Sequence, residues 1–177
     1  MIDERSPQID PAVLVTGAEK LYHQGKCDNA IDLLVAAGEQ MPESHQIQVK
    51  LADLLIDSEQ YADALTILNN VPDKGIDTQI VARKGYCQAG LGDYRSATQS
   101  VDDVLANEPN NPVALHLSGL IAFQTDLQAR AEHFFRKALT LDPDYGQAHK
   151  DLGLAIKKGG DPAAALNLLE NGFKCAP

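Results

Sequence analysis

The sequence repeats itself with a period close to 34 residues, and each period carries two short amphipathic helix patterns. The clearest copy is 111–143, in which Asn111 and Pro112 open a first helix, a polar turn follows, and Pro143 closes a second helix. A fixed period of this length, with one helix pair per period, is typical of a stacked helical solenoid. Units begin at spacings of 34, 33, 34 and 34 residues, near Pro11, His45, Thr78, Pro112 and Gly146.

Small and large residues recur at fixed positions of this period. Small residues allow two helices to approach closely, and larger neighbours fill the groove beside them. One small column lies in the first helix pattern: Ala18, Ala52, Gly85, Gly119 and Gly153. In the second pattern an alanine column precedes a larger apolar column by four residues: Ala30, Ala64, Ala97, Ala131 and Ala165, then Leu34, Leu68, Val101, Phe135 and Leu169.

These patterns predict an all-α protein, an α-solenoid of five antiparallel helix pairs. Residues 1–10 are polar and unpatterned, and they predict a flexible leader. The array is expected to cover 11–177. Helix N-caps are expected where a short polar residue precedes a helix pattern, at Asp10, Asp77, Asn111 and Asp161. The repeats are expected at about 11–44, 45–77, 78–111, 112–145 and 146–177.

The charge balance narrows the class of partner. The chain has 25 acidic and 15 basic residues, a net charge of −10, and no basic stripe. Such a chain is a poor candidate for binding nucleic acid or an anionic membrane surface. The charge is uneven: residues 1–77 hold 14 acids and 5 bases, whereas residues 146–177 hold 3 and 4. This gradient gives the array electrical polarity.

The sequence also indicates a compartment. No run approaches the length of a membrane span, and the N-terminal segment lacks the basic and apolar regions of a secretory signal. Cys27, Cys87 and Cys175 are an odd set without metal-type spacing, so reduced thiols are expected. A cytoplasmic location follows as an expectation.

No arrangement of residues predicts catalysis, a metal site or a cofactor. Gly90 and Gly92 lie in a helix–helix turn and follow no strand, unlike a phosphate-binding loop. The histidines show neither an i,i+4 pair nor a neighbouring cysteine cluster. Asp102 and Asp103 diverge by about 100° on a helix, which indicates a solvated face. The sequence therefore predicts a binding protein and not an enzyme.

The repeat resembles the tetratricopeptide repeat (TPR) family over roughly residues 11–177. The family's leucine–glycine pair is matched by Leu152 and Gly153, and its alanine followed by an aromatic by Ala131 and Phe135. Closing prolines stand at Pro42, Pro109, Pro143 and Pro177, whereas Ile76 occupies the second unit's proline position. The family's early tryptophan is replaced by Leu14, Gln48, Val81, Leu115 and His149. The resemblance implies a right-handed superhelix.

In this family the first helix of each pair lines the concave face, so the resemblance implies where a partner would bind. Carried over by repeat phase, the first two repeats contribute Val15, Glu19, Tyr22, Val49, Asp53 and Ile56. The last three contribute Arg83, Tyr86, His116, Leu117, Leu120, Phe123, Lys150, Leu154 and Lys157. The alternative for the aliphatic members is that they pack against adjacent helices.

Some TPR domains hold a terminal carboxylate of a chaperone tail with lysine and asparagine side chains. The matching positions here are Val15 and Glu19, or Val49 and Asp53. An acid would repel a carboxylate, so this ligand is not expected.

The function predicted is a protein–protein interaction scaffold that binds an apolar or amphipathic segment in the concave groove. The segment's basic end is expected near the first two repeats and its acidic end near the fifth. One alternative is an N-terminal accessory domain of a larger enzyme, such as a glycosyl- or sulfotransferase. Another is self-association through an uncapped last helix that exposes Leu166, Leu169 or Phe173.

Overall fold

A computed structural model describes residues 10–71 and 77–174, with side chains as far as residue 170. These residues form two compact units, 1–75 and 76–177, which are described separately. The described part of the first unit holds α1 (Pro11–His23), α2 (Cys27–Gln40), α3 (His45–Asp57) and α4 (Tyr61–Asn70). That of the second holds α5 (Thr78–Gly90), α6 (Tyr94–Asn107), α7 (Pro112–Gln124), α8 (Gln128–Leu141), α9 (Gly146–Lys158) and α10 (Pro162–Lys174).

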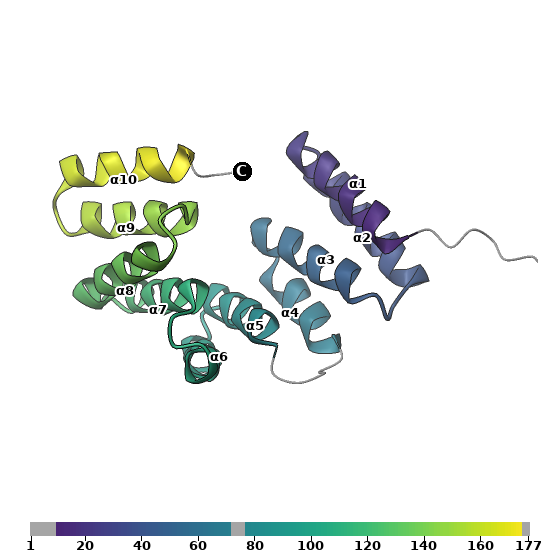
Figure 1. The fold of residues 1–177 in the computed structure, drawn as a ribbon, viewed down its shortest axis with the longest axis horizontal. Coiled ribbons are helices and arrows are strands. Elements are labelled where there is room, and N and C mark those ends of the chain that lie inside the picture. Colours follow the sequence, from purple (N-terminus) through teal and green to yellow (C-terminus); the bar gives the residue numbers. More distant parts are fainter. Residues whose placement is uncertain (1–9, 72–76, 175–177) are drawn as a thin grey trace, which may run out of the picture. The chain divides into compact units, whose positions relative to one another are not determined.

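The helices pack in consecutive pairs (Figure 1), and we call the first helix of each pair the A helix and the second the B helix. In the first unit the A helices α1 and α3 contact each other, and α2 packs against α3. The second unit repeats this arrangement: α7 contacts both α5 and α9, and each B helix packs against the next A helix. The predicted all-α array of helix pairs is confirmed for the described residues, which contain no strand.

The four predicted N-caps are all present. Each cap side chain accepts a hydrogen bond from a backbone N–H two or three residues further on, at 2.9 to 3.0 Å: Ala12 to Asp10, Gln79 to Asp77, Ala114 to Asn111 and Ala164 to Asp161. These bonds satisfy donors that the first helical turn leaves unpaired. The short polar residues therefore set the starts of α1, α5, α7 and α10.

The repeating columns form the interior of each unit. All five members of the alanine column are buried, and so are Leu34, Leu68, Val101 and Phe135 of the apolar column. A Cβ added to Gly119 would lie 2.6 Å from the Phe135 ring, and one added to Gly153 would lie 2.9 Å from Leu169. The small residues therefore create the space that the large residues of the partner helix fill.

The turn inside each helix pair contains one residue with a positive φ angle. The five positions are spaced like the repeats, but only three of them are glycines: Gly25, Glu59, Gly92, Asp126 and Gly160. Left-handed backbone costs a residue with a Cβ about 1–2 kcal/mol. Glu59 and Asp126 therefore hold a conformation that glycine would adopt more readily.

Some sequence predictions fall at the edges of the described residues. Residues 1–9 of the leader predicted at 1–10 lie outside them, and so do the junction at 72–76, which contains Ile76, and Cys175. Helix α10 exposes 58% of Leu166, as predicted, whereas Leu169 packs toward Gly153 and is partly buried. The side chain of Phe173 lies outside the described part of the chain.

Candidate functional site

The predicted binding residues of the second unit lie on its A helices. Apart from the adjacent pair His116 and Leu117, neighbouring members on one helix are three or four residues apart, so they share one face of that helix. Seven of them keep solvent-exposed surface, and we call this set the A-helix face: Arg83 and Tyr86 on α5, Leu120 and Phe123 on α7, and Lys150, Leu154 and Lys157 on α9. Among these Leu154 is the most exposed apolar side chain, at 45%.

Two other predicted groove residues, His116 and Leu117, are fully buried. Leu117 packs against Ala97 and Val101 of the B helix α6, and it fills the space beside Gly85. Leu117 lies about 100° around the helix from His116, and its side chain is covered by α6. The prediction that His116 and Leu117 present their side chains to a ligand is therefore wrong.

His116 instead links α7 to α9. Its Nε2 atom lies 2.7 Å from Oδ2 of Asp151, and its Nδ1 atom lies 3.2 Å from the hydroxyl oxygen of Tyr145. The ring stacks on Tyr86, with 6.4 Å between centroids, and packs against Phe135 at 5.5 Å. Both ring nitrogens thus have partners, as a buried imidazole requires. The buried His116 ring therefore fixes the position of Tyr86, a member of the A-helix face, from the interior side.

Tyr145, which completes this network, was not predicted from the sequence. It stands at the N-cap position of α9. Burial raises the pKa of its phenol above the ordinary value of 10.0, and the negative charges of Tyr86, Asp151 and Asp142 add to the effect. The phenol therefore remains protonated at neutral pH.

One signal in the sequence could have revealed these contacts. Polar pairs that join consecutive A helices lie about one repeat apart along the chain: His116 and Asp151 are separated by 35 residues, and so are Tyr22 and Asp57. Lys50 and Glu19 are separated by 31. Because A helices stack in register, a residue about one period downstream lies beside the first.

Charges border the apolar part of the A-helix face. Lys158 pairs with Asp126 in the turn that follows α7. The same ammonium lies 4.9 Å from the centroid of the Phe123 ring, within the range of a cation–π contact. With Lys150 and Lys157, α9 carries three lysines, of which Lys158 lies beside Phe123. An anionic group bound here would meet positive charge.

The first unit has a smaller set of predicted residues on α1 and α3. All six are partly exposed: Val15, Glu19, Tyr22, Val49, Asp53 and Ile56. Lys50 pairs with Glu19 at 2.8 Å, and this hydrogen bond and charge lower the pKa of the Glu19 carboxyl. These residues lie on A helices that contact each other.

A second polar pair joins α1 to α3. Tyr22 donates a hydrogen bond to Asp57. Burial raises the pKa of the Tyr22 phenol, and the Asp57 carboxylate raises it further. Burial also raises the pKa of Asp57, partly offset by the bond from Tyr22. The pair therefore favours a protonated phenol at the end of the first unit's A helices.

Two kinds of feature, a metal site and a membrane-spanning helix, were looked for in the described residues. Within residues 10–71 and 77–170, no group of three or more His, Cys, Asp or Glu side chains is placed to hold a metal ion. In the same residues, no helix is both long and apolar enough to cross a membrane.

Comparison with known proteins identifies the repeat. Two models described as tetratricopeptide repeat match residues 21–83 and 84–146. The chain belongs to the tetratricopeptide repeat family. Membership supports a role for this TPR array as a protein–protein interaction scaffold.

Curated relatives of this TPR array are longer proteins. It is 32% identical over 108 residues to FK506-binding protein-like from Mus musculus, covering 60% of this chain and 31% of the relative. It is 26% identical over 133 residues to the protein SGT1 homolog from Homo sapiens, covering 74% and 36%. The chain thus spans about a third of the length of these relatives.

A solved structure shares the TPR fold. A thermophilic TPR protein from Thermus thermophilus superposes with a TM-score of 0.79 at 17% identity, covering 95% of this chain and 92% of that protein. At this identity the similarity concerns the fold alone. It agrees with the fold class predicted from the sequence.

Proposed function

We propose that this TPR array is a scaffold whose A-helix face binds an apolar or amphipathic peptide segment of a protein partner. The observation that carries the proposal is that apolar side chains on three consecutive A helices keep exposed surface: Tyr86, Leu120, Phe123 and Leu154. Burying such surface against a ligand contributes about 25 cal/mol per Å². The proposal includes no catalytic step.

The charges suggest how the segment lies. Lys150, Lys157 and Lys158 stand on α9, so the acidic end of the segment is proposed to face the last repeat. In the first unit, three acids on the A helices (Glu19, Asp53 and Asp57) outnumber two lysines (Lys20 and Lys50) and favour a basic segment. Flanking charges of this kind mainly set orientation and the rate of encounter.

A peptide selection tests the proposal. Random peptides displayed on phage are selected against the full chain, and the selected peptides are titrated against variants. Changing Leu120 and Phe123 together to Ser should abolish binding while the helical circular-dichroism signal persists. Changing Leu91 to Ser is the matched control, since Leu91 is exposed but lies in a turn outside the A-helix face. Binding that survives the double change would contradict the proposal.

A second candidate function is self-association through α10. The observation in its favour is the exposure of Leu166, and a neighbouring copy would bury that side chain. Sedimentation of the wild type and of a Leu166→Lys variant tests it. Self-association is expected in the first and loss of it in the second, and a wild-type monomer at high concentration would rule it out.

We further propose that the protein acts in a reducing compartment such as the cytoplasm. In support, Cys27 and Cys87 are not joined in a disulfide in the described part of the chain, and Cys87 is buried as a small apolar residue inside α5.

A further inference from the structure

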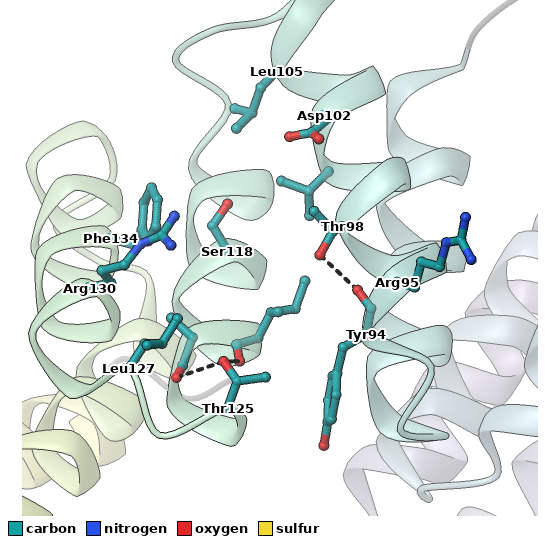
Figure 2. Close-up of a pocket in the computed structure, with 13 residues that line it drawn as sticks. Tyr94, Arg95, Thr98, Asp102, Leu105, Ser118, Thr125, Leu127, Arg130 and Phe134 are labelled. Atoms are coloured by element: carbon teal, nitrogen blue, oxygen red, sulfur yellow. Dashed lines mark hydrogen bonds between the residues drawn. The ribbon is translucent and has the colours of Figure 1, made fainter.

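The second unit contains an open cavity of about 510 Å³ lined by residues of α6, α7 and α8 (Figure 2). This size lies within the range of about 300–1,000 Å³ that is usual for ligand pockets. Its apolar lining includes the buried Val101 and Ala122 and the partly buried Ile121. The cavity plays no part in the function proposed above.

The cavity and the A-helix face use opposite sides of α7. Ser118, Ile121 and Thr125 line the cavity, at spacings of three and four residues. Leu120 and Phe123 belong to the A-helix face. With about 100° between successive residues, the two sets point in nearly opposite directions. A ligand in the cavity would therefore leave the A-helix face accessible.

The hydroxyl groups that line the cavity are available as acceptors. Thr98 donates to the Tyr94 carbonyl at 2.7 Å, Thr125 to the Ile121 carbonyl at 2.8 Å, and Ser118 to the Ala114 carbonyl at 2.9 Å (Figure 2 draws the two threonine bonds). Each hydroxyl proton is thus already used. The remaining lone pairs can accept hydrogen bonds, for example from the N–H groups of an extended peptide.

The positive charge of the cavity comes from two arginines on opposite walls. Arg95 lies on α6 and Arg130 on α8, and Figure 2 shows the Arg95 guanidinium turned away from α7. The Arg130 guanidinium lies 6.0 Å from the centroid of the Phe134 ring. The Arg95 charge interacts with the carboxylate of Asp93, two residues before it in the chain. Asp102 is the acidic residue of the lining, near Leu105 (Figure 2).

We infer that this cavity is a second docking site, for a short peptide segment of a partner in which an apolar side chain is flanked by carboxylates. The apolar side chain would contact the apolar lining. One carboxylate would pair with Arg130, and another would pair with Arg95 once that exposed side chain turns toward the cavity, because an Arg fork suits a carboxylate. Asp102 would keep acidic groups away from the Leu105 end. Charge complementarity selects an acidic segment over a basic one.

A titration with a matched pair of peptides tests the inference. The probes are acetyl-Asp-Leu-Phe-Asp-amide and its neutral analogue acetyl-Asn-Leu-Phe-Asn-amide, added to the ¹⁵N-labelled full chain and followed by amide chemical shifts. NMR can detect the weak binding that is expected of such short peptides. The acidic probe should shift the amides of Thr98, Ser118 and Thr125, and the neutral probe should bind about tenfold or more weakly.

Variants test which arginine side chains bind the carboxylates of the acidic probe. Arg95→Gln and Arg130→Gln should each weaken the acidic probe about tenfold. The control is Arg136→Gln, since Arg136 lies on the same helix as Arg130 but pairs with Glu132 outside the cavity lining. The double variant Leu120→Ser, Phe123→Ser should bind the acidic probe as the wild type does, which separates the inference from the function proposed for the A-helix face.

Three results would overturn the inference. They are equal binding of the two probes, absence of shifts in the cavity amides, and shifts confined to the A-helix face. If the cavity amides shift instead when the protein alone is concentrated, the occupant is a second copy of this chain and the inferred partner is wrong.

Discussion

The ring of Phe135 on α8 packs directly against Gly119 of α7, in the space that a side chain at Gly119 would need. A Cβ on Gly119 would lie 2.6 Å from two atoms of the Phe135 ring. Both residues are buried, so neither has an alternative position in solvent. The contact pairs the small column of the A helix with the large column of the B helix. Phe135 also contacts the ring of His116.

Gly119→Ala should therefore destabilise the protein although alanine is the better helix former. The gain in helix propensity is about 1 kcal/mol, whereas overpacking costs about 1–3 kcal/mol. The matched control is Gly17→Ala in α1, where the nearest atom, Cδ2 of Leu33, is 3.5 Å from the added Cβ, so the change should be neutral or stabilising. Urea unfolding midpoints measure both. A Gly119→Ala variant as stable as the wild type would show that the helices are less closely packed.

Glu59→Gly should stabilise the first unit by about 1 kcal/mol. Glu59 has a φ angle of 59°, at the turn position where three other repeats have glycine. The reverse change, Gly92→Ala, should destabilise the second unit by a similar amount. Because nothing lies within 4 Å of the added Cβ at Gly92, the loss would come from the backbone alone. Thermal unfolding of the two variants should show shifts of opposite sign, and shifts of the same sign would contradict the assignment.

The His116–Asp151 bond should show measurable coupling between α7 and α9. His116 is fully buried and Asp151 one-quarter exposed, so removal of one partner leaves the other without its bond in a poorly solvated place. A double-mutant cycle with His116→Phe and Asp151→Asn should give a coupling free energy of about 1 kcal/mol or more. The control is the Lys158–Asp126 pair, which is mostly exposed and should give about 0.5 kcal/mol or less. Equal couplings would refute the structural role of the buried bond.

Because of Tyr145, the free energy of unfolding should fall as the pH rises above 10.0, the ordinary pKa of a tyrosine phenol. Burial raises the pKa of this phenol in the folded protein, so above pH 10 the unfolded chain releases a proton that the folded chain retains. The stabilising contribution is complete below that pH and is lost progressively above it. Alkaline unfolding, followed by tyrosinate absorbance and helical circular dichroism, should be shallower for Tyr145→Phe. An unchanged alkaline profile would mean that Tyr145 is not held in its buried position.

The helices themselves were predictable because their signals are local. A polar residue before a proline sets a helix start, as Asp10 does for α1. The repeat period then gave the pairing, since Ala131 and Phe135 recur in phase with equivalents in the other repeats. Their burial was predicted and is confirmed.

The residues that face a partner were less predictable, because exposure depends on what the next repeat covers. Repeat phase placed His116 and Leu117 in the groove, but α6 covers Leu117 and α9 covers His116. Tyr145, which contacts His116, stands at the start of α9 and was not in phase with the predicted groove residues. The cavity between α6 and α8 has no signature along the chain, since Arg95 and Arg130 are brought to its walls only when α7 packs between their helices. The sequence by itself determined the helices and their repeat, through local hydrogen bonds and periodicity. The tertiary structure decided which polar groups are buried, paired or left facing a cavity, because that depends on packing between repeats.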